Sequence, residues 1–127
     1  MNVPNELRYS REHEWVRVDG PRARIGITDF AQESLGDVVF VQLPDVGLEI
    51  VAGASAAEIE STKSVSDVYV PISGVVHAVN DALVETPELL NQDPYGAGWI
   101  LEVSVVDATE LDALMNAEAY RDLVGEG

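Results

Sequence analysis

The chain has 127 residues, of which 46% are hydrophobic, and this is enough for one soluble domain with a sizeable core. Its 23 acidic and seven basic side chains give a formal net charge of −16, which argues against nucleic acid and anionic membrane surfaces as partners. The absence of cysteine excludes disulfides, thiolate metal sites and cysteine nucleophiles.

Short runs typical of β-strands follow one another along the chain. Valine occurs 19 times and isoleucine six times, and β-branched residues favour strands. The predicted strands are His13 to Val18, Ala23 to Ile27, Asp37 to Leu43, Ala54 to Ile59, Val68 to Ile72, Gly74 to Val79 and Trp99 to Val105. This spacing, without long helices between the strands, predicts a sandwich or barrel of small sheets.

The predicted helices are short and peripheral. The segment Asp29 to Leu35 follows Thr28, has the capping-box spacing of Asp29 and Gln32, and ends before Gly36. We expect one further helical turn over Pro87 to Leu90.

A helical segment is also predicted at the C-terminus, over about residues 108–124. Thr109 can cap it, and Leu111, Leu114 and Tyr120 belong to its apolar stripe. We expect this segment to pack on a β body of about residues 9–106. No low-complexity linker interrupts the chain, so residues 1–127 are expected to form a single domain.

The arginines crowd the start of the chain, where Arg8, Arg11, Arg17, Arg22 and Arg24 fall within the first 24 residues. Residues 64–127, in contrast, carry 12 acids and one base. Two interpretations stay open. The arginines pair with acids of the same fold and keep it soluble, or one face docks on charged surfaces of partner proteins.

The single lysine of the chain, Lys63, lies between two strand-like runs. The residues around it are small and hydroxylic (Glu60-Ser61-Thr62-Lys63-Ser64-Val65-Ser66-Asp67), which is typical of a hairpin tip. We therefore expect the Lys63 amine to be exposed at this tip.

Three interpretations of Lys63 compete. It is a solvated surface lysine, or a Schiff-base or general-base lysine, or the attachment point of a covalently carried cofactor. A catalytic lysine needs a lowered pKa, whereas nearby Glu58, Glu60 and Asp67 would favour the ammonium form. A cofactor arm needs an exposed amine, a rigid turn and small flanking residues, and the sequence supplies all three.

Several motifs follow in a fixed order over roughly Tyr9 to Arg121. They are Tyr9-Ser10-Arg11-Glu12-His13-Glu14-Trp15-Val16, Gly26-Ile27-Thr28-Asp29, Ala31-Gln32, Leu35-Gly36-Asp37-Val38-Val39-Phe40-Val41, Leu43-Pro44, Glu60 to Tyr69, Pro71-Ile72-Ser73-Gly74, Val79-Asn80 and Asn91 to Trp99. In this order they resemble the glycine cleavage H-protein family, a relative of lipoyl domains. The resemblance implies a mostly β barrel-sandwich hybrid of two small antiparallel sheets, with short peripheral helices and a helical C-terminus.

The resemblance also implies a non-catalytic carrier in glycine catabolism and one-carbon metabolism. Lys63 would bear lipoate as N6-lipoyllysine, attached by a lipoate ligase or a lipoyl/octanoyl transferase. The carrier would take an aminomethyl group from the PLP-dependent glycine decarboxylase (P protein) to the tetrahydrofolate-dependent aminomethyltransferase (T protein). Dihydrolipoyl dehydrogenase (L protein) would then reoxidise it.

Two acidic residues are implied to hold the aminomethylated arm in a surface cleft. They are Glu14 and Asp67. The alternative interpretation of Glu14 is a solvated glutamate on a strand, and that of Asp67 is a turn aspartate that bonds its own backbone amides. Phe30 stands where many family members have histidine, so no polar contact is expected from that position. His13 and His77 are too far apart in sequence to suggest a metal site, and we predict no metal.

Two rival functions stay open. A biotinyl carrier usually has methionines beside its lysine, but Met1 and Met115 are the only methionines here. The second rival is a lipoate-relay or unmodified interaction module.

The first motif follows Met1 by eight residues, which leaves little room for a transit peptide and predicts a cytoplasmic chain.

Overall fold

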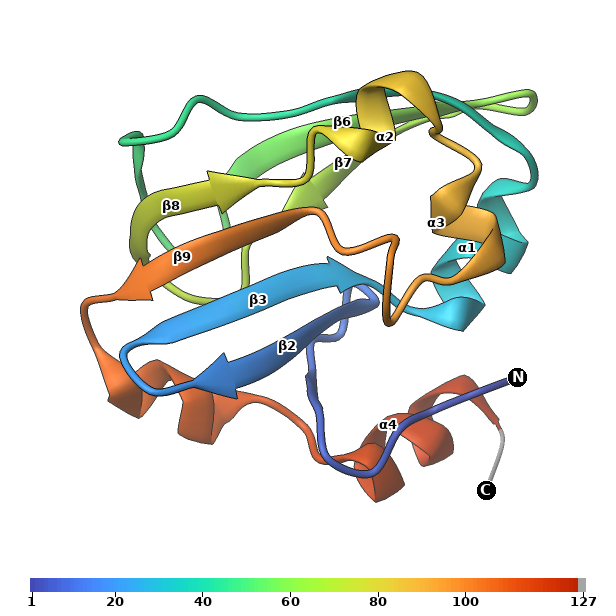
Figure 1. Ribbon diagram of the computed structural model, residues 1–127. Helices are drawn as coiled ribbons and strands as arrows, with labels where there is room; N and C mark the ends of the chain where they lie inside the picture. Colours follow the sequence, from blue (N-terminus) through green and yellow to red (C-terminus); the bar gives the residue numbers. More distant parts are fainter. Residues whose placement is uncertain (126–127) are drawn as a thin grey trace.

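The structure is a computed structural model that describes residues 1–125, and it is mostly β (Figure 1). Within these residues the strands form two antiparallel sheets, with the orders β1-β2-β3-β9-β8-β5 and β4-β6-β7. The strands are β1 Arg8–Tyr9, β2 Glu14–Asp19, β3 Arg22–Ile27, β4 Val38–Gln42, β5 Glu49–Ile50, β6 Ser55–Ser61, β7 Val65–Tyr69, β8 Gly74–Val79 and β9 Leu101–Val105. The predicted pair of small antiparallel sheets is confirmed, whereas the two-residue strands β1 and β5 were not predicted.

The six-stranded sheet brings together strands that lie far apart in the chain. β2 and β3 form a hairpin with Val16 opposite Ile25, and β9 lies between β3 and β8 with Leu101 opposite Ile25. On the next strand, Val76 is opposite Val103. All of these side chains are buried, so one face of this sheet supplies half of the main core.

The three-stranded sheet supplies the other half of the core and carries the predicted lysine turn. Ile59 on β6 and Val68 on β7 are buried against the first sheet. β7 begins at Val65, three residues earlier than predicted, because Val65 pairs directly with Glu60. Only residues 62–64 therefore lie between β6 and β7.

A second, aromatic cluster lies on the other side of β2, where the N-terminal segment and the C-terminal helix cover the sheet (Figure 1). Trp15 is fully buried there, together with Tyr9 and Tyr120. The Trp15 ring packs directly on the backbone of Gly26, where a Cβ atom would lie 2.6 Å from the ring. Its Nε1 donates to the Pro94 carbonyl at 2.9 Å. The first half of β2, from Glu14 to Val16, is thus buried on both of its faces.

The helix α1 (Asp29–Leu35) confirms its prediction. The Thr28 side chain accepts a hydrogen bond from an amide of the first turn, and Gly36 ends the helix with a φ of 76°. Two one-turn helices, α2 (Ala82–Glu85) and α3 (Leu89–Gln92), connect β8 to β9. Only one such turn was predicted in this stretch.

The C-terminal region is helical as predicted, but its predicted cap is wrong. A 3₁₀ helix, η1 (Ala108–Ala113), begins after Asp107 and not after Thr109. The Asp107 carboxylate accepts hydrogen bonds from both the amide and the hydroxyl of Thr109. An aspartate is a strong N-cap, and it precedes the threonine here.

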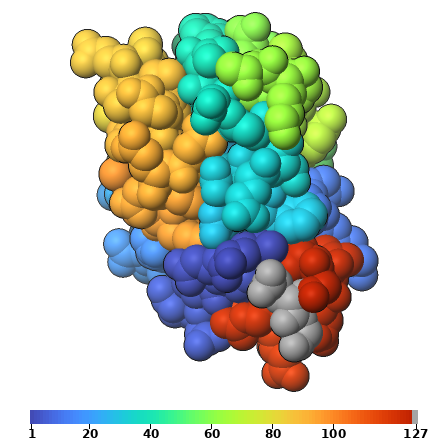
Figure 2. Space-filling view, turned by 90° about the vertical axis from the view of Figure 1, so that its right-hand side faces the viewer, coloured from blue at the N-terminus to red at the C-terminus, as the bar shows by residue number. Residues whose placement is uncertain are grey.

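The C-terminal helical region is also interrupted. Met115 is extended and exchanges two backbone hydrogen bonds of 2.8 Å with Tyr9, so the helix cannot continue through it. A second helix, α4 (Ala117–Val124), begins after Asn116 and lies beside the N-terminal segment (Figure 2). Within residues 1–125 no helix is long and apolar enough to cross a membrane.

One of the two interpretations of the arginines was that they pair with acids of the same fold, and Arg24 does so. Within the described part of the chain, the salt bridge between Arg24 and Glu102, with an N···O distance of 3.4 Å, is the only one. Arg24 also lies over the ring of Trp99, and Arg17 over the ring of Trp15. Among the described residues the arginines therefore form no network of salt bridges with the acids.

Candidate functional site

The hairpin tip between β6 and β7 is held by the side chain and backbone of Ser61. The Ser61 amide donates to the Ser64 carbonyl at 2.8 Å, and the Ser61 hydroxyl accepts from the amides of Lys63 and Ser64, both at 3.2 Å. The Thr62 amide donates to the Asp37 carbonyl at 3.0 Å, which ties the tip to the start of β4. Thr62 and Lys63 are exposed, so the tip presents the lysine on a fixed turn.

The Lys63 side chain lies against the end of α1. A Cβ atom on Gly36 would lie 3.2 Å from Lys63 Cε, so the missing side chain at this position leaves room for the lysine. Within residues 1–125 the Lys63 ammonium forms no salt bridge, and none of its hydrogen bonds comes from the side chain. The amine is therefore accessible for chemical modification.

A cleft of about 300 Å³ begins beside the hairpin tip. It is lined by residues 12–14 at the start of β2, by the α1 region with Phe30 and Ala31, by residues 64–68 of the hairpin and by Ile59 of β6. Glu14 and Asp67 both lie in this lining, so the structure brings together two residues that are 53 positions apart in the sequence. Lys63 lies next to the cleft, directly before its lining residue Ser64.

Glu14 is a buried carboxyl, with only 2% of its surface exposed. Burial raises its pKa to about 7, although hydrogen bonds from the Ser10 hydroxyl and the Tyr69 backbone act in the opposite direction. Within the described residues Glu14 takes part in no salt bridge. Near neutral pH the carboxyl is therefore partly protonated, and a cation entering the cleft would favour its ionised form.

Asp67 is exposed and lies in β7 opposite Glu58, not in a turn. Its carboxylate accepts hydrogen bonds from the Ser55 hydroxyl at 3.2 Å and the Tyr69 hydroxyl at 3.5 Å. Both donors are exposed and uncharged, so they leave the negative charge of Asp67 in place. The cleft thus has one buried carboxyl group, that of Glu14, and two exposed ones, those of Glu12 and Asp67.

Comparisons with known proteins show the family of the chain. A family model described as "Glycine cleavage H-protein" matches residues 7–127. The chain belongs to the glycine cleavage H-protein family. The glycine cleavage system H protein of Mycobacterium avium (strain 104) is 58% identical over 130 residues, which cover 98% of each chain. That of Geobacillus sp. (strain WCH70) is 54% identical over 127 residues and covers all of both chains.

A solved structure agrees with the fold of this H-protein family member. The crystal structure of a glycine cleavage system H protein from Mycobacterium marinum superposes with a TM-score of 0.89 at 42% sequence identity. The match covers 97% of this chain and 99% of that one. The barrel-sandwich arrangement inferred from the motifs is confirmed.

Two residues of this family member contribute to the cleft in ways that the sequence did not indicate. Ser10 orients the Glu14 carboxyl through its hydroxyl, at 2.6 Å. His13, interpreted from sequence as a packing or surface residue, lines the cleft and packs on the Phe30 ring with centroids 4.5 Å apart. Alternation along a strand does not predict either contact, because both depend on turns that precede β2.

Metal-ligating side chains do not gather at this site. Within the described residues no group of three or more histidine, cysteine, aspartate or glutamate side chains is placed to hold an ion. His13 lies in the cleft wall, and His77 is exposed on β8.

Proposed function

We propose that this H-protein family member is a non-catalytic carrier that holds lipoate in amide linkage on Lys63. The observation that carries the proposal is the lysine itself, because it is the one side-chain amine of the chain and stands exposed on a hydrogen-bonded two-residue tip. The neighbouring cleft is close enough for an arm attached at the tip to fold into it. These features fit the requirements of a swinging arm.

The cleft residues fit the cargo that such an arm would carry. Bound lipoate supplies the sulfur to which an aminomethyl group is attached, and that group has a positively charged amine at neutral pH. Glu14 and Asp67 would hold this amine, because carboxylates form strong charge-assisted hydrogen bonds with ammonium groups. Ile27, Phe30 and Leu35 would exclude water from the adduct.

The partners follow from the proposed reaction sequence. Glycine decarboxylase would load the aminomethyl group, the tetrahydrofolate-dependent aminomethyltransferase would accept it, and dihydrolipoyl dehydrogenase would restore the disulfide. A lipoate ligase or a lipoyl/octanoyl transferase would modify Lys63 first. We further propose that residues 1–127 act as one domain in the cytoplasm.

Intact-mass spectrometry after co-expression with a lipoate ligase tests the attachment. We expect the wild-type chain to gain one lipoyl group and Lys63→Arg to gain none, with the same thermal unfolding curve for both unmodified proteins. A wild-type chain that stays unmodified, while a known lipoyl domain in the same cells is modified, contradicts the proposal. A lipoyl group retained by Lys63→Arg, or a biotinyl group gained instead, contradicts it as well.

A further inference from the structure

The backbone of His13 has an uncommon conformation. Its φ is 71°, and within residues 1–125 it is the only residue other than glycine with a positive φ. A residue with a Cβ atom adopts this region at a cost, so surrounding contacts must hold it there. The His13 amide donates to the Ser10 carbonyl at 3.2 Å, and the His13 carbonyl accepts from the Thr28 amide at 3.0 Å. These bonds fix the backbone but not the imidazole.

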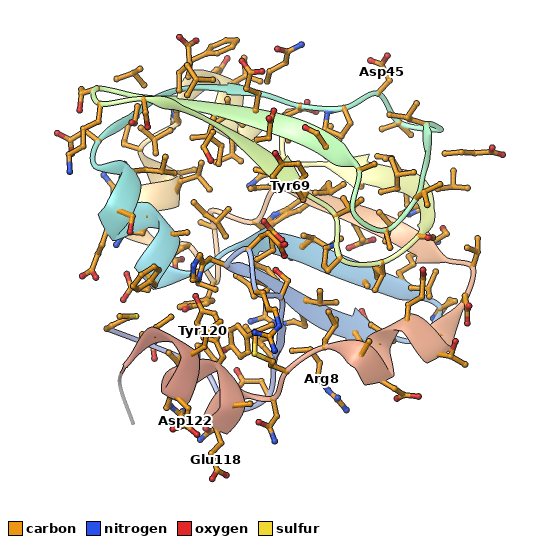
Figure 3. The ribbon with its side chains drawn as sticks, turned by 180° about the vertical axis from the view of Figure 1, so that it is seen from behind. Arg8, Asp45, Tyr69, Glu118, Tyr120 and Asp122 are labelled. Atoms are coloured by element: carbon orange, nitrogen blue, oxygen red, sulfur yellow. The ribbon has the colours of Figure 1, made fainter. Side chains whose placement is uncertain are left out.

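The imidazole is held by a residue from the opposite end of the chain. The Tyr120 hydroxyl lies 2.8 Å from His13 Nδ1 and 2.7 Å from Thr28 Oγ1. Tyr120 is fully buried on the side of α4 that faces the sheets, whereas Glu118 and Asp122 point away from them (Figure 3). A single phenol therefore contacts a side chain before β2 and the residue that caps α1.

The protons of this group have two possible arrangements. Thr28 Oγ1 accepts from the Ala31 amide at 3.2 Å and still has its own proton and a second acceptor lone pair. Tyr120 therefore either accepts from Thr28 and donates to an unprotonated His13 Nδ1, or accepts from His13 Nδ1–H and donates to Thr28. In both arrangements the Tyr120 hydroxyl holds the imidazole through Nδ1.

This hydrogen-bonded group spans two walls of the cleft. On one side, His13 lies between Glu12 and Glu14, and all three line the cleft. On the other, Thr28 begins the helix that carries the lining residue Phe30. The Tyr120 hydroxyl thus joins the Glu14 wall and the α1 wall through their side chains, in addition to the backbone bond between the Thr28 amide and the His13 carbonyl.

The hydroxyl has a role separate from the packing of the Tyr120 ring. The ring stacks on Tyr9 with centroids 4.6 Å apart and planes at 12°, and phenylalanine would keep that contact. Tyr9 provides a matched control, because its hydroxyl is also internal but donates to the Pro4 carbonyl at 2.6 Å, away from His13. Tyr120→Phe and Tyr9→Phe therefore each remove one hydroxyl from the same ring pair, and only Tyr120→Phe removes a hydrogen bond to a residue that lines the cleft.

We propose that Tyr120 is a positioning residue for the cleft, whose hydroxyl holds His13 and the cap of α1 together and so keeps Glu14 in place for a positively charged arm. The inference rests on the proposed carrier function for the identity of the arm. The hydrogen-bonded group itself is testable without it.

The first experiment is an NMR titration of the two histidines in the unmodified chain. Burial lowers the pKa of His13, and Glu12 acts against this. Tyr120→Phe removes the hydrogen-bond partner of His13 Nδ1 and should change both the His13 pKa and the ratio of its ring tautomers, whereas Tyr9→Phe should leave both unchanged. The exposed His77 serves as the internal reference and should not respond. An unchanged His13 in Tyr120→Phe overturns the proposal.

The second experiment uses the lipoylated chain, loaded with an aminomethyl group by glycine decarboxylase, and follows loss of that group by intact mass. Because Tyr120→Phe lacks one positioning hydrogen bond, it should lose the aminomethyl group about 2- to 10-fold faster than wild type or Tyr9→Phe. Equal loss in all three proteins overturns the positioning role even if the carrier function holds. A wild-type chain that never accepts lipoate contradicts the carrier function instead, and the titration then decides whether Tyr120 holds His13.

Discussion

The Ser10 hydroxyl forms hydrogen bonds with both the side chain and the backbone of Glu14. Ser10 Oγ donates to Glu14 Oε1 at 2.6 Å and accepts from the Glu14 amide at 3.0 Å. The serine thereby fixes the carboxyl in one orientation without neutralising it. A fixed, buried acid without a cationic partner among the described residues is poised to respond to a cation, because ion pairing would offset the cost of its burial.

The burial of Glu14 predicts a pH-dependent cost in stability. Its pKa is about 7 in the folded chain against 4.5 for the ordinary group. Between these values the unfolded chain loses its proton first, so the free energy of unfolding falls as the pH rises, and the full cost, at most about 3 kcal/mol, is present above pH 7.

Replacing Glu14 by glutamine separates the cost of ionising Glu14 from the pH effects of the other acidic residues. Glu14→Gln keeps an acceptor for Ser10 but cannot ionise, so its stability relative to wild type should increase from about pH 4.5 to pH 7 and then level off. Urea denaturation at a series of pH values measures the difference. A difference that does not vary with pH would show that Glu14 ionises normally.

Asp67 should protect the loaded arm by a smaller amount. Its carboxylate is exposed and screened by solvent, so Asp67→Asn should speed loss of the aminomethyl group less than about 5-fold, and added salt should reduce the effect. Asp81→Asn, the same change at an exposed aspartate before α2, is the control. Similar rates for the two variants would remove Asp67 from the arm site.

The hairpin tip should depend on Ser61. Ser61→Ala removes the hydroxyl that accepts from the Lys63 and Ser64 amides, so the lysine should be less well presented and lipoylation about 2- to 10-fold slower. Ser64→Ala removes a hydroxyl from the same tip but leaves these bonds, and its rate should match wild type. The initial rate of lipoylation by a purified ligase measures both.

The contact between Gly26 and Trp15 should make the β3 position intolerant of a methyl group. Gly26→Ala would place a Cβ atom 2.6 Å from a ring that is held by its bond to Pro94, and we expect a loss of about 1–3 kcal/mol in the free energy of unfolding. The loss should be smaller in a Trp15→Phe background, where the ring is smaller. An equal loss in both backgrounds would locate the strain elsewhere.

Local signals in the sequence predicted the local structure. The threonine and glycine that flank α1 were sufficient for its bounds, and alternation was sufficient for most strands. Two-residue strands such as β1 are too short for any alternation to be visible. The break in the C-terminal helix depends on the pairing of Met115 with Tyr9, across 106 positions, which no local pattern contains.

Only those parts of the candidate site that depend on local sequence signals could be predicted. Lys63 was recognisable because a turn sequence surrounds it, but the burial of Glu14 was not. Trp15 and Val16 are buried on opposite faces of β2, and Glu14 is buried with them, so alternation gave no contrast between the two faces. The contact of His13 with Tyr120 spans 107 positions and needed the three-dimensional structure.

The isolation of the Lys63 ammonium bears on how the fold responds when that charge is removed. Within residues 1–125 it has no salt-bridge partner, so acylation of the amine would leave no carboxylate unpaired. Loss of the positive charge by itself should therefore leave the folding free energy unchanged. A modifying enzyme would act on the folded chain, and removal of the lysine charge would cost no folding free energy.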